Sequence, residues 1–364
     1  AVVVLKLRIL GIWLGLLLLG CGAGSGDDAG GSGGGDSSTD WLIPVGDVQD
    51  GGPGKDGIPA IDNPQFLSAN ADEVSLLDSQ LIVGVLTAGQ AKAYPHDILD
   101  WHEIVNDRQS DTSITLSYCP LTGSAITWEQ ATEQGDLTFG VSGLLYNSNL
   151  ILYDRSTDSN WSQMQQRAVH GSRSGESLVA RQRLTIETTW GQWRQWFTAT
   201  LVLSRDTGFT RNYGVYPYGD YLVSSRLLFN TDNSDDNRLH PKARGLGVIT
   251  SGAVKVYEIS GFEDDFQVIN DQVCGLNVVI LGSRSSRFGL AFRRDHQGQT
   301  LMFEAVHDGE RRHFKDQLGQ VWDITGQGVS ESVQGETLTA ITHYTAFWFA
   351  WTAFFGDVEL HAFK

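Results

Sequence analysis

The sequence predicts a mainly β, α+β fold made of two tandem copies of one sheet-rich unit, each with a short aromatic helix. Short β-prone runs separated by turn residues predict the strands along the chain. Blocks of similar residues that recur at a nearly constant offset predict the two copies, residues 56–239 and residues 240–364. An aromatic cluster with helical spacing in the later part of each copy predicts the helices.

The internal repeat rests on five pairs of blocks that keep their order along the chain. The longest pair joins residues 84–94 to residues 247–257 at an offset of 163. The other pairs, at offsets between 161 and 164, are residues 104–107 with 268–271, residues 137–139 with 301–303, Asp154 with Asp316, and Trp161 with Trp322. Because order and spacing agree over all the pairs, the sequence predicts two copies of one fold unit.

Each copy is predicted to begin with a hairpin and to continue through further strands to its aromatic helix. In the first copy, Ala88 and Gly89 join two β-prone runs, residues 81–86 and 91–94. The strands predicted next are residues 112–118, 125–128 and 137–141, and in the second copy residues 277–281, 288–293 and 300–306. The predicted helices contain Trp190, Trp193 and Trp196 after Thr188 as N-cap, and Trp348, Trp351 and Phe355 after Thr345.

The N-terminal segment has the features of a bacterial lipoprotein signal. Lys6 and Arg8 precede an apolar run at residues 9–19, which is too short to span a bilayer but suits a signal-peptide core. The junction before Cys21 resembles the lipobox, where cleavage exposes a cysteine that is then acylated. We therefore expect a signal at residues 1–21 and a lipid on Cys21. That lipid would hold the protein on a membrane of the cell envelope, at its periplasmic or extracellular face.

Residues 22–55 are predicted to form a flexible tether between the lipid and the two copies. Residues 22–40 contain eight Gly and four Asp, so this stretch cannot bury enough apolar surface to offset its ordering entropy.

The charge of the chain limits its partners. The formal net charge of −17 argues against nucleic acid and against anionic membrane surfaces as partners. The remaining partners are the membrane, through the lipid, and an envelope protein or a small ligand.

Polar side chains that occur in only one copy mark the candidate site, because residues shared by both copies are expected to determine the fold. At an offset of 164, Phe266 replaces His102 and Ser283 replaces Cys119. Residues 142–149 have no similar counterpart in the second copy. We therefore expect the first copy to bear the site and the second to be a degenerate scaffold.

Long motifs of the chain resemble the domain of unknown function 3179 family. The resemblance covers about residues 55–360 and rests on IPAID at residues 58–62, AYP at 93–95, WHEIVND at 101–107, YCPL at 118–121, GVSGLLYNS at 140–148, WSQ at 161–163 and AFWFAW at 346–351. It implies an exported, often lipid-anchored protein of bacteria or archaea and assigns no activity. Many members resemble Cys-Pro-Leu-Cys-Gly where this chain has Thr122 as the fourth residue. Dithiol redox chemistry at Cys119 is therefore not expected here.

The first functional hypothesis is a site for copper or another soft metal ion, or for a thiol-reactive ligand, built on Cys119 and His102. A thiolate and an imidazole are ligands that soft ions prefer. Free backbone N–H groups near the strand end could also lower the pKa of the Cys119 thiol. The other side chains expected to line the site are Tyr118, Ser124, Tyr146, Asn147, Ser148 and Trp161. The alternative without chemistry is a buried cysteine that packs as a small apolar side chain.

The second hypothesis is hydrolysis or acyl transfer. Cys119 would be the nucleophile, His102 the base, and Glu103 or Asp107 the group that orients the base. The residue types suffice for this chemistry, and the sequence leaves open whether the protein is an enzyme.

The third hypothesis is a non-catalytic module that binds a sugar, a peptide or another envelope protein. Aromatic and amide side chains would form its binding surface: Trp101, Tyr146, Tyr153, Trp161, Asn147, Asn149 and Gln163. A groove lined by aromatic faces, with Cys119 buried away from it, would favour this hypothesis.

Overall fold

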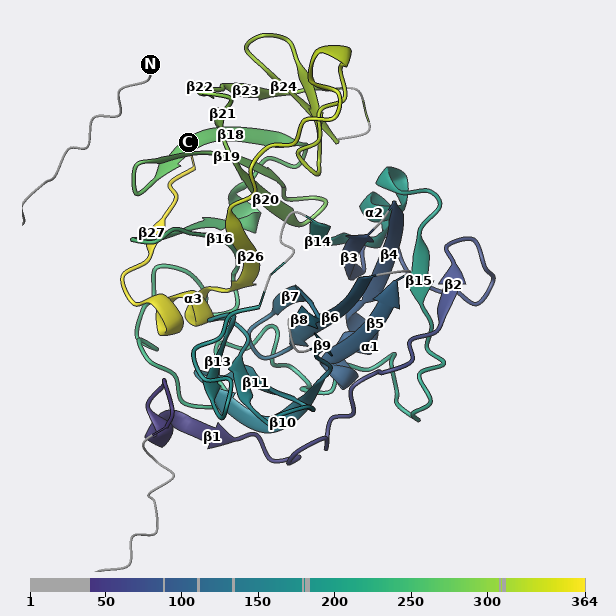
Figure 1. Ribbon diagram of the computed structural model, residues 1–364, viewed down its shortest axis with the longest axis vertical. Helices are drawn as coiled ribbons and strands as arrows, with labels where there is room; N and C mark the ends of the chain where they lie inside the picture. Colours follow the sequence, from purple (N-terminus) through teal and green to yellow (C-terminus); the bar gives the residue numbers. More distant parts are fainter. Residues whose placement is uncertain are drawn as a thin grey trace, which may run out of the picture. The chain divides into compact units, whose positions relative to one another are not determined.

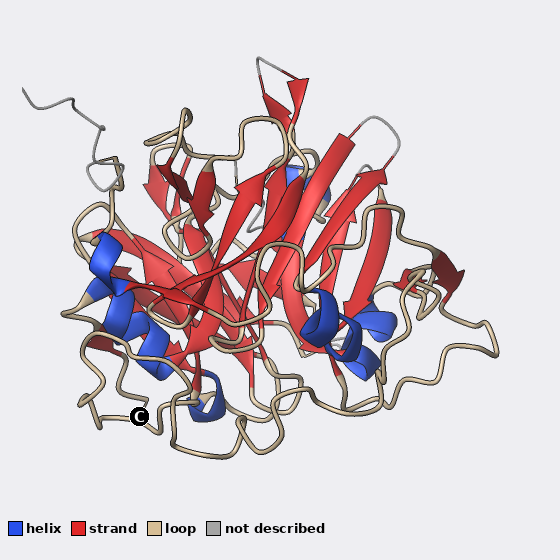
Figure 2. Cartoon of the chain, turned by 90° about the horizontal axis from the view of Figure 1, so that it is seen from below, coloured by secondary structure: helices blue, strands red, loops and turns tan. Residues whose placement is uncertain are grey.

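Strands dominate the computed structural model, which describes residues 40–363 except residues 88, 110–111, 133–134, 179, 181–183, 308 and 310–311. The content of 42% strand and 10% helix confirms the mainly β, α+β class (Figure 2). The predicted signal with Cys21, and residues 22–39 of the predicted tether, lie outside the described residues. Among the helices that the structure describes, none is long and apolar enough to cross a membrane.

The first half of the chain forms two five-stranded sheets, a three-stranded sheet and a two-stranded sheet (Figure 1). Its elements are β1 (Val48–Asp50), β2 (Phe66–Ser68), β3 (Leu81–Thr87), β4 (Gln90–Pro95), α1 (His96–His102), β5 (Ile104–Gln109), β6 (Thr112–Cys119), β7 (Ser124–Glu129), β8 (Ala131–Thr132), β9 (Gly135–Asp136), β10 (Phe139–Tyr146), β11 (Asn149–Asp154), β12 (Asn160–Ser162), β13 (Arg167–His170), β14 (Thr185–Thr189), α2 (Trp190–Trp196) and β15 (Leu201–Leu203). The five-stranded sheets have the orders β14-β3-β4-β15-β2 and β1-β10-β11-β12-β13, the three-stranded sheet is β5-β6-β7, and the two-stranded sheet is β8-β9. The predicted hairpin is therefore confirmed as β3 and β4, and the first predicted aromatic helix as α2. Thr189, one residue after the predicted Thr188, caps α2 through its side chain.

The second half contains a comparable set of elements. They are β16 (Arg244–Ile249), β17 (Val254–Glu258), the 3-10 helix η3 (Ile259–Gly261), β18 (Gln267–Val273), β19 (Leu276–Ser283), β20 (Phe288–Arg293), β21 (Asp295–His296), β22 (Gln299–Thr300), β23 (Phe303–Ala305), β24 (His313–Asp316), β25 (Val321–Asp323), the 3-10 helix η4 (Glu331–Val333), β26 (Thr342–Phe347), α3 (Trp348–Phe355) and β27 (Glu359–Leu360). The second aromatic helix is confirmed as α3, although Phe347 rather than Thr345 precedes it. The predicted strand at residues 300–306 is divided between β22 and β23, so it is shorter than expected.

Strand pairing follows the same order in both halves. The order β14-β3-β4-β15 has two antiparallel pairs and then a parallel one, and β26-β16-β17-β27 has the same sequence of pairs. The three-stranded sheets β5-β6-β7 and β18-β19-β20 are both antiparallel meanders. One difference lies after the hairpin, where the first half has α1 and the second has only the shorter η3.

Side-chain contacts also recur at corresponding positions. The amide of Asn106 binds both the backbone N–H and the carbonyl of Phe139, and Asn270 binds Phe303 in the same way. Further recurring contacts are Trp161 Nε1 to Asp154 and Trp322 Nε1 to Asp316, and the tyrosine-to-aspartate bonds of Tyr94 with Asp107 and Tyr257 with Asp271. These contacts fix one strand to the next, so the two halves use the same polar interactions to hold their sheets.

Each aromatic helix packs into a core that contains residues of the other half. Trp348 and Trp351 of α3 share a hydrophobic cluster with Trp128 and Trp161 of the first half. The tryptophans of α2 share another cluster with the second half, where Trp196 meets Phe288 edge-to-face at a centroid distance of 5.1 Å. The halves are therefore joined by reciprocal burial of apolar surface rather than by a small polar interface.

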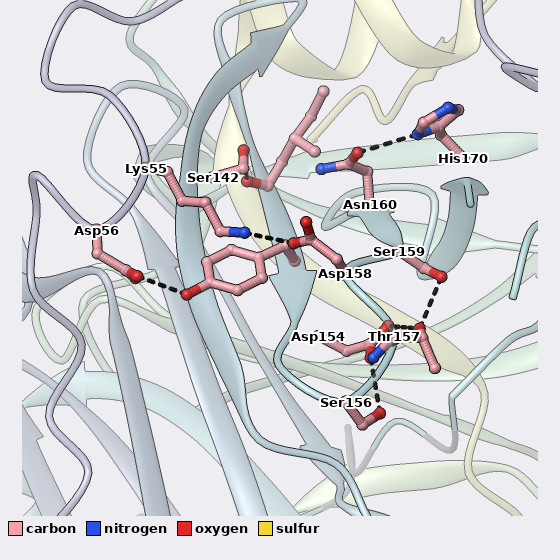
Figure 3. Close-up of polar contacts among 12 residues, drawn as sticks. Lys55, Asp56, Ser142, Asp154, Ser156, Thr157, Asp158, Ser159, Asn160 and His170 are labelled. Atoms are coloured by element: carbon pink, nitrogen blue, oxygen red, sulfur yellow. Dashed lines mark hydrogen bonds and ion pairs between the residues drawn. The ribbon is translucent and has the colours of Figure 1, made fainter. Parts of the chain in front are cut away.

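The prediction of a flexible tether at residues 22–55 is wrong for residues 41–55. β1 pairs antiparallel with β10, and Trp41 stacks on His170 at a centroid distance of 4.4 Å. Figure 3 shows Lys55 in an ion pair with Asp158, at an N–O distance of 2.5 Å. Because this stretch gains a strand partner and an aromatic contact, residues 41–55 form part of the folded unit despite their many glycines.

Candidate functional site

Cys119 is the last residue of β6, and its thiol is enclosed by the core. The residue is 1% exposed, and its Sγ lies 3.7 Å from the carbonyl oxygen of Ser148. Burial, followed by the nearby charge of Glu103, raises the pKa of the thiol to about 11. The prediction that backbone N–H groups lower this pKa is therefore wrong, because the net change is an increase. Hydrogen bonds from Thr122 and from the backbone of Leu150 favour a lower pKa of the thiol, but the effect of burial is larger. The thiol is neutral at pH 7.

His102 ends α1, and both of its ring nitrogens are already engaged. Nδ1 lies 2.8 Å from the carbonyl oxygen of Pro59, and Nε2 lies 2.7 Å from the hydroxyl of Tyr213. Burial lowers the pKa of the ring, which favours its neutral form. A neutral imidazole held at both nitrogens is a satisfied core histidine, and it has no free nitrogen for a metal or a substrate.

The structure does not join His102 to Cys119 as a ligand pair. Tyr213, which binds His102, belongs to one hydrophobic cluster, together with Tyr118. Cys119 belongs to another cluster, because successive residues of a strand point to opposite faces. Nowhere in the described ranges do three or more His, Cys, Asp or Glu side chains gather closely enough to hold a metal ion.

Ser124 takes part in a buried hydrogen-bond network near the end of β6. Its hydroxyl donates to Gln163 Oε1 at 2.7 Å, and Asn149 Nδ2 donates to the same oxygen at 2.7 Å. Thr122 accepts from Asn149 and contacts Ser124, both at 2.9 Å. Since these side chains satisfy one another, the network supports the turn after Cys119 and does not offer groups to a ligand.

The other predicted wall residues also make internal contacts. Tyr146 packs edge-to-face on Phe354 at 5.4 Å, and Asn147 donates to the carbonyl of Ala353 at 3.2 Å. Trp161 is 1% exposed. These side chains, with Ser148, are interior, so they do not form the open aromatic groove that the third hypothesis requires.

Glu103 is the residue of this region with the most unusual environment. It follows α1 with a φ of 58°, a left-handed conformation that is uncommon for residues other than glycine. The residue is 5% exposed, and burial raises the pKa of its carboxyl to about 8, although a hydrogen bond from Tyr218 at 3.5 Å opposes this. Most Glu103 carboxyls are therefore protonated at pH 7 and can donate a hydrogen bond.

A long segment between the halves covers this region. We call residues 204–243 the connector; it contains no described helix or strand. Its tyrosines reach back to the ends of α1 and β6: Tyr213 binds His102, Tyr218 binds Glu103, and Tyr221 donates to the carbonyl of Leu121 at 2.8 Å. A structured loop of this length inside a compact unit commonly has a functional role.

A buried ion pair lies beside the same strand end. Arg244 binds the carboxylate of Glu187 and donates to the carbonyl of Gly123 at 3.1 Å. His96 Nε2 lies 3.3 Å from Glu187, and its ring lies 4.6 Å from that of Tyr118. Burial would raise the pKa of Glu187, but Arg244 and His96 outweigh it and lower the pKa. The negative charge of Glu187 is therefore balanced by the positive charge of Arg244 at this strand end.

Comparison with known proteins places the chain in a family. A model of the family described as protein of unknown function, DUF3179, matches residues 55–358. The chain belongs to this family. The resemblance predicted from the motifs is thus confirmed over most of the chain. No curated protein and no solved structure is significantly similar to it.

In this DUF3179 protein, the second half lacks the groups found around Glu103. Gln267 stands at the position that corresponds to Glu103, and Ser283 at that of Cys119. Ser283 donates to the backbone carbonyl of Asp264 at 2.8 Å, which is an ordinary structural contact. The ring of Tyr216 lies 5.6 Å from that of Tyr218. We refer to Glu103, Cys119, Tyr216 and Tyr218 as the acid–thiol site; among the described residues it has no equivalent in the second half.

Sequence reasoning gave Glu103 only a supporting role, as a group that orients His102. It did not single out the connector tyrosines. A visible signal was the density of tyrosine in the connector, at positions 213, 216, 218 and 221. A tyrosine every two to three residues in a segment without strand alternation indicates side chains that pack onto a neighbouring surface.

Proposed function

We propose that this protein is a lipid-anchored protein of the cell envelope whose acid–thiol site binds a small ligand with an acceptor oxygen. The anchor is supported by the signal-like segment before Cys21, its basic residues and its short apolar run. The envelope location, at the periplasmic or extracellular face, follows from the same feature.

The observation that carries the ligand site is the gathering of protonated donors in an apolar setting. Glu103 has a raised pKa, the Cys119 thiol is neutral, and Tyr218 lies against Glu103. A protonated carboxyl beside a tyrosine hydroxyl forms a strong donor set for a carbonyl or carboxylate oxygen. The Tyr216 hydroxyl is buried and has no hydrogen-bond partner among the described residues, so it can supply a further donor.

Access to the site would depend on the connector, because its tyrosines cover Glu103 and Cys119. The connector carries exposed apolar side chains, with Val215 54% exposed and Val223 81% exposed. The connector is anchored elsewhere, by Tyr221 in the core and by the bonds of Asn147 and Ser148 to Asp232 and Phe229. Its stretch around Tyr218 belongs to no strand, so this stretch can move without breaking a strand ladder. We propose that it opens to admit the ligand and closes to exclude water.

We further propose that residues 56–239 and 240–364 are two copies of one unit and that the second is a scaffold. The matching strand order and the recurring Asn106 and Asn270 contacts support this interpretation. The change of Glu103 to Gln267 and of Cys119 to Ser283 supports a site in the first copy alone.

The chemistry predicted first has less support. A soft metal at Cys119 and His102 would need a deprotonated thiol and a free imidazole nitrogen, and the contacts of both residues oppose this. A Cys119 nucleophile with His102 as base meets the same objection. We keep the hypothesis of a non-catalytic binding module, but we propose that the ligand binds at the acid–thiol site and not in an aromatic groove.

The test is ligand-induced stabilisation of residues 22–364 by a panel of short carboxylates and amides. Binding should raise the thermal midpoint of the wild type, and Glu103→Ala and Tyr218→Phe, which each remove a donor, should reduce that shift. Tyr153→Phe removes a hydroxyl elsewhere in the same half and should leave the shift unchanged. Metal analysis with Cys119→Ser and His102→Ala completes the design. Stoichiometric copper lost in both variants would replace this proposal with the metal hypothesis.

A further inference from the structure

A small cavity lies where four strands from the two halves meet. Its volume is about 30 Å³, and it is lined by residues of β7, β14, β20 and β26. Two of the strands belong to the first half and two to the second. A space of one probe sphere, roughly 10–15 Å³, is enough to hold a water molecule. The cavity therefore has room for one or two.

His343 lines this cavity, and one of its ring nitrogens lacks a hydrogen-bond partner among the described residues. The residue is 3% exposed, and its Nδ1 lies 2.8 Å from the carbonyl oxygen of Ile341. A carbonyl only accepts hydrogen bonds, so Nδ1 must carry the proton and Nε2 must present a lone pair. Nε2 is buried and has no partner among the described residues. A buried acceptor requires a donor, and the cavity that His343 lines is a space in which one can lie.

Thr127 supplies the second unsatisfied group. It lines the same cavity from β7, is 1% exposed, and its hydroxyl has no partner in the described part of the chain. A hydroxyl can donate or accept, whereas the Nε2 of His343 can only accept in its neutral form. One molecule that donates to Nε2 and accepts from Thr127 satisfies both groups.

We propose that this cavity is an internal hydration site, in which one or two water molecules bridge His343 and Thr127 across the junction of the halves. Glu187 also lines the cavity, so the bound water has an anionic neighbour. Buried water of this kind makes two to four hydrogen bonds to polar groups and forms part of the fold. The site is independent of the acid–thiol site and of the ligand proposed for it.

Crystals of residues 22–364, examined at high resolution and under xenon pressure, test the proposal. Ordered water density within about 2.7–3.2 Å of both His343 Nε2 and Thr127 Oγ1 is the expected result. Xenon should not enter, because it occupies dry apolar cavities. Xenon density in the wild-type cavity, or no ordered density near Nε2, would overturn the proposal.

A matched double variant adds a positive control for xenon. Thr127→Val and His343→Leu together replace the polar lining with apolar groups of similar size, so the cavity should lose its water and bind xenon. If the double variant does not fold, the wild-type maps still decide the question. Water-to-protein NMR contacts at the His343 ring provide the same answer in solution, since a resident water gives a cross-peak and a dry cavity does not.

Discussion

Glu103→Gln is the substitution that tests the acid–thiol site most directly. Glutamine keeps the shape of the side chain and its ability to donate a hydrogen bond, but it cannot ionise. It is also the residue found at the corresponding position of the second half, Gln267. If burial holds the Glu103 carboxyl in its protonated form, the variant should be more stable than the wild type at alkaline pH and similar to it in acid.

The magnitude follows from the shift in the Glu103 pKa, from an ordinary 4.5 to about 8. Below pH 4.5 the carboxyl is protonated in both the folded and the unfolded chain, and the stabilising effect of the raised pKa is complete. As the pH rises, the unfolded chain ionises first, and the wild type loses about 1.4 kcal/mol per pH unit. The loss ends near pH 8 and totals about 5 kcal/mol, and the Gln variant should not show it.

The assay is urea unfolding of residues 22–364 at intervals from pH 4 to pH 9, for the wild type and the variant. The difference between their unfolding free energies should grow over this range, with unchanged denaturant dependence. Glu73→Gln, at an exposed glutamate, serves as the control and should give a curve parallel to the wild type. Parallel curves for Glu103→Gln would refute the reasoning, because they would mean that the Glu103 carboxyl is already ionised in the folded protein at neutral pH.

Further predictions follow from burial and close packing. In native residues 22–364, a disulfide reagent should label exposed Cys274 quickly and buried Cys119 only at the rate of unfolding, and equal labelling would contradict the burial of Cys119. Gly84→Ala and Gly247→Ala should each destabilise the protein by about 1–3 kcal/mol, because the added Cβ would lie 2.1 Å and 2.3 Å from a tryptophan ring of α2 and α3 respectively; an unchanged urea midpoint in either variant would show that the helix can shift freely. Burial lowers the pKa of His343 to about 4, so the wild type should lose about 3 kcal/mol of stability as the pH falls from 6.5 to 4, and His343→Leu should abolish that dependence in the same titration.

The strands and aromatic helices could be predicted because their signals are local. The hairpin of β3 and β4 has β-prone runs on both sides of a Gly-containing turn, and α2 has tryptophans at helical spacing. The helix α1 was not predicted, because no side chain caps it, whereas α2, of equal length, has the cap of Thr189. The N-cap of α1 is Pro95, a residue that reads locally as the end of an extended run.

The site could be predicted only in part, since its character depends on distant contacts. Cys119 was singled out for a lowered pKa, whereas its pKa is raised by burial, which no local pattern records. His102 was paired with it on residue type alone, whereas the fold places His102 against Tyr213 of the connector. Glu103 acquires its environment in the same way, from Tyr218, which lies 115 positions further along the chain.

The reciprocal packing of the aromatic helices makes each half necessary for the core of the other. Because α3 completes the core around Trp128 and Trp161, and α2 completes the core around Phe288, neither half can lose its helix without exposing the apolar interior of the other. The second half is therefore needed for packing, although its described residues contain no counterpart of the acid–thiol site. The end of β6 is covered by the connector, whose Tyr221 lies in the same cluster as Cys119 and Trp348. A change of Cys119 therefore also affects the core that the two halves share.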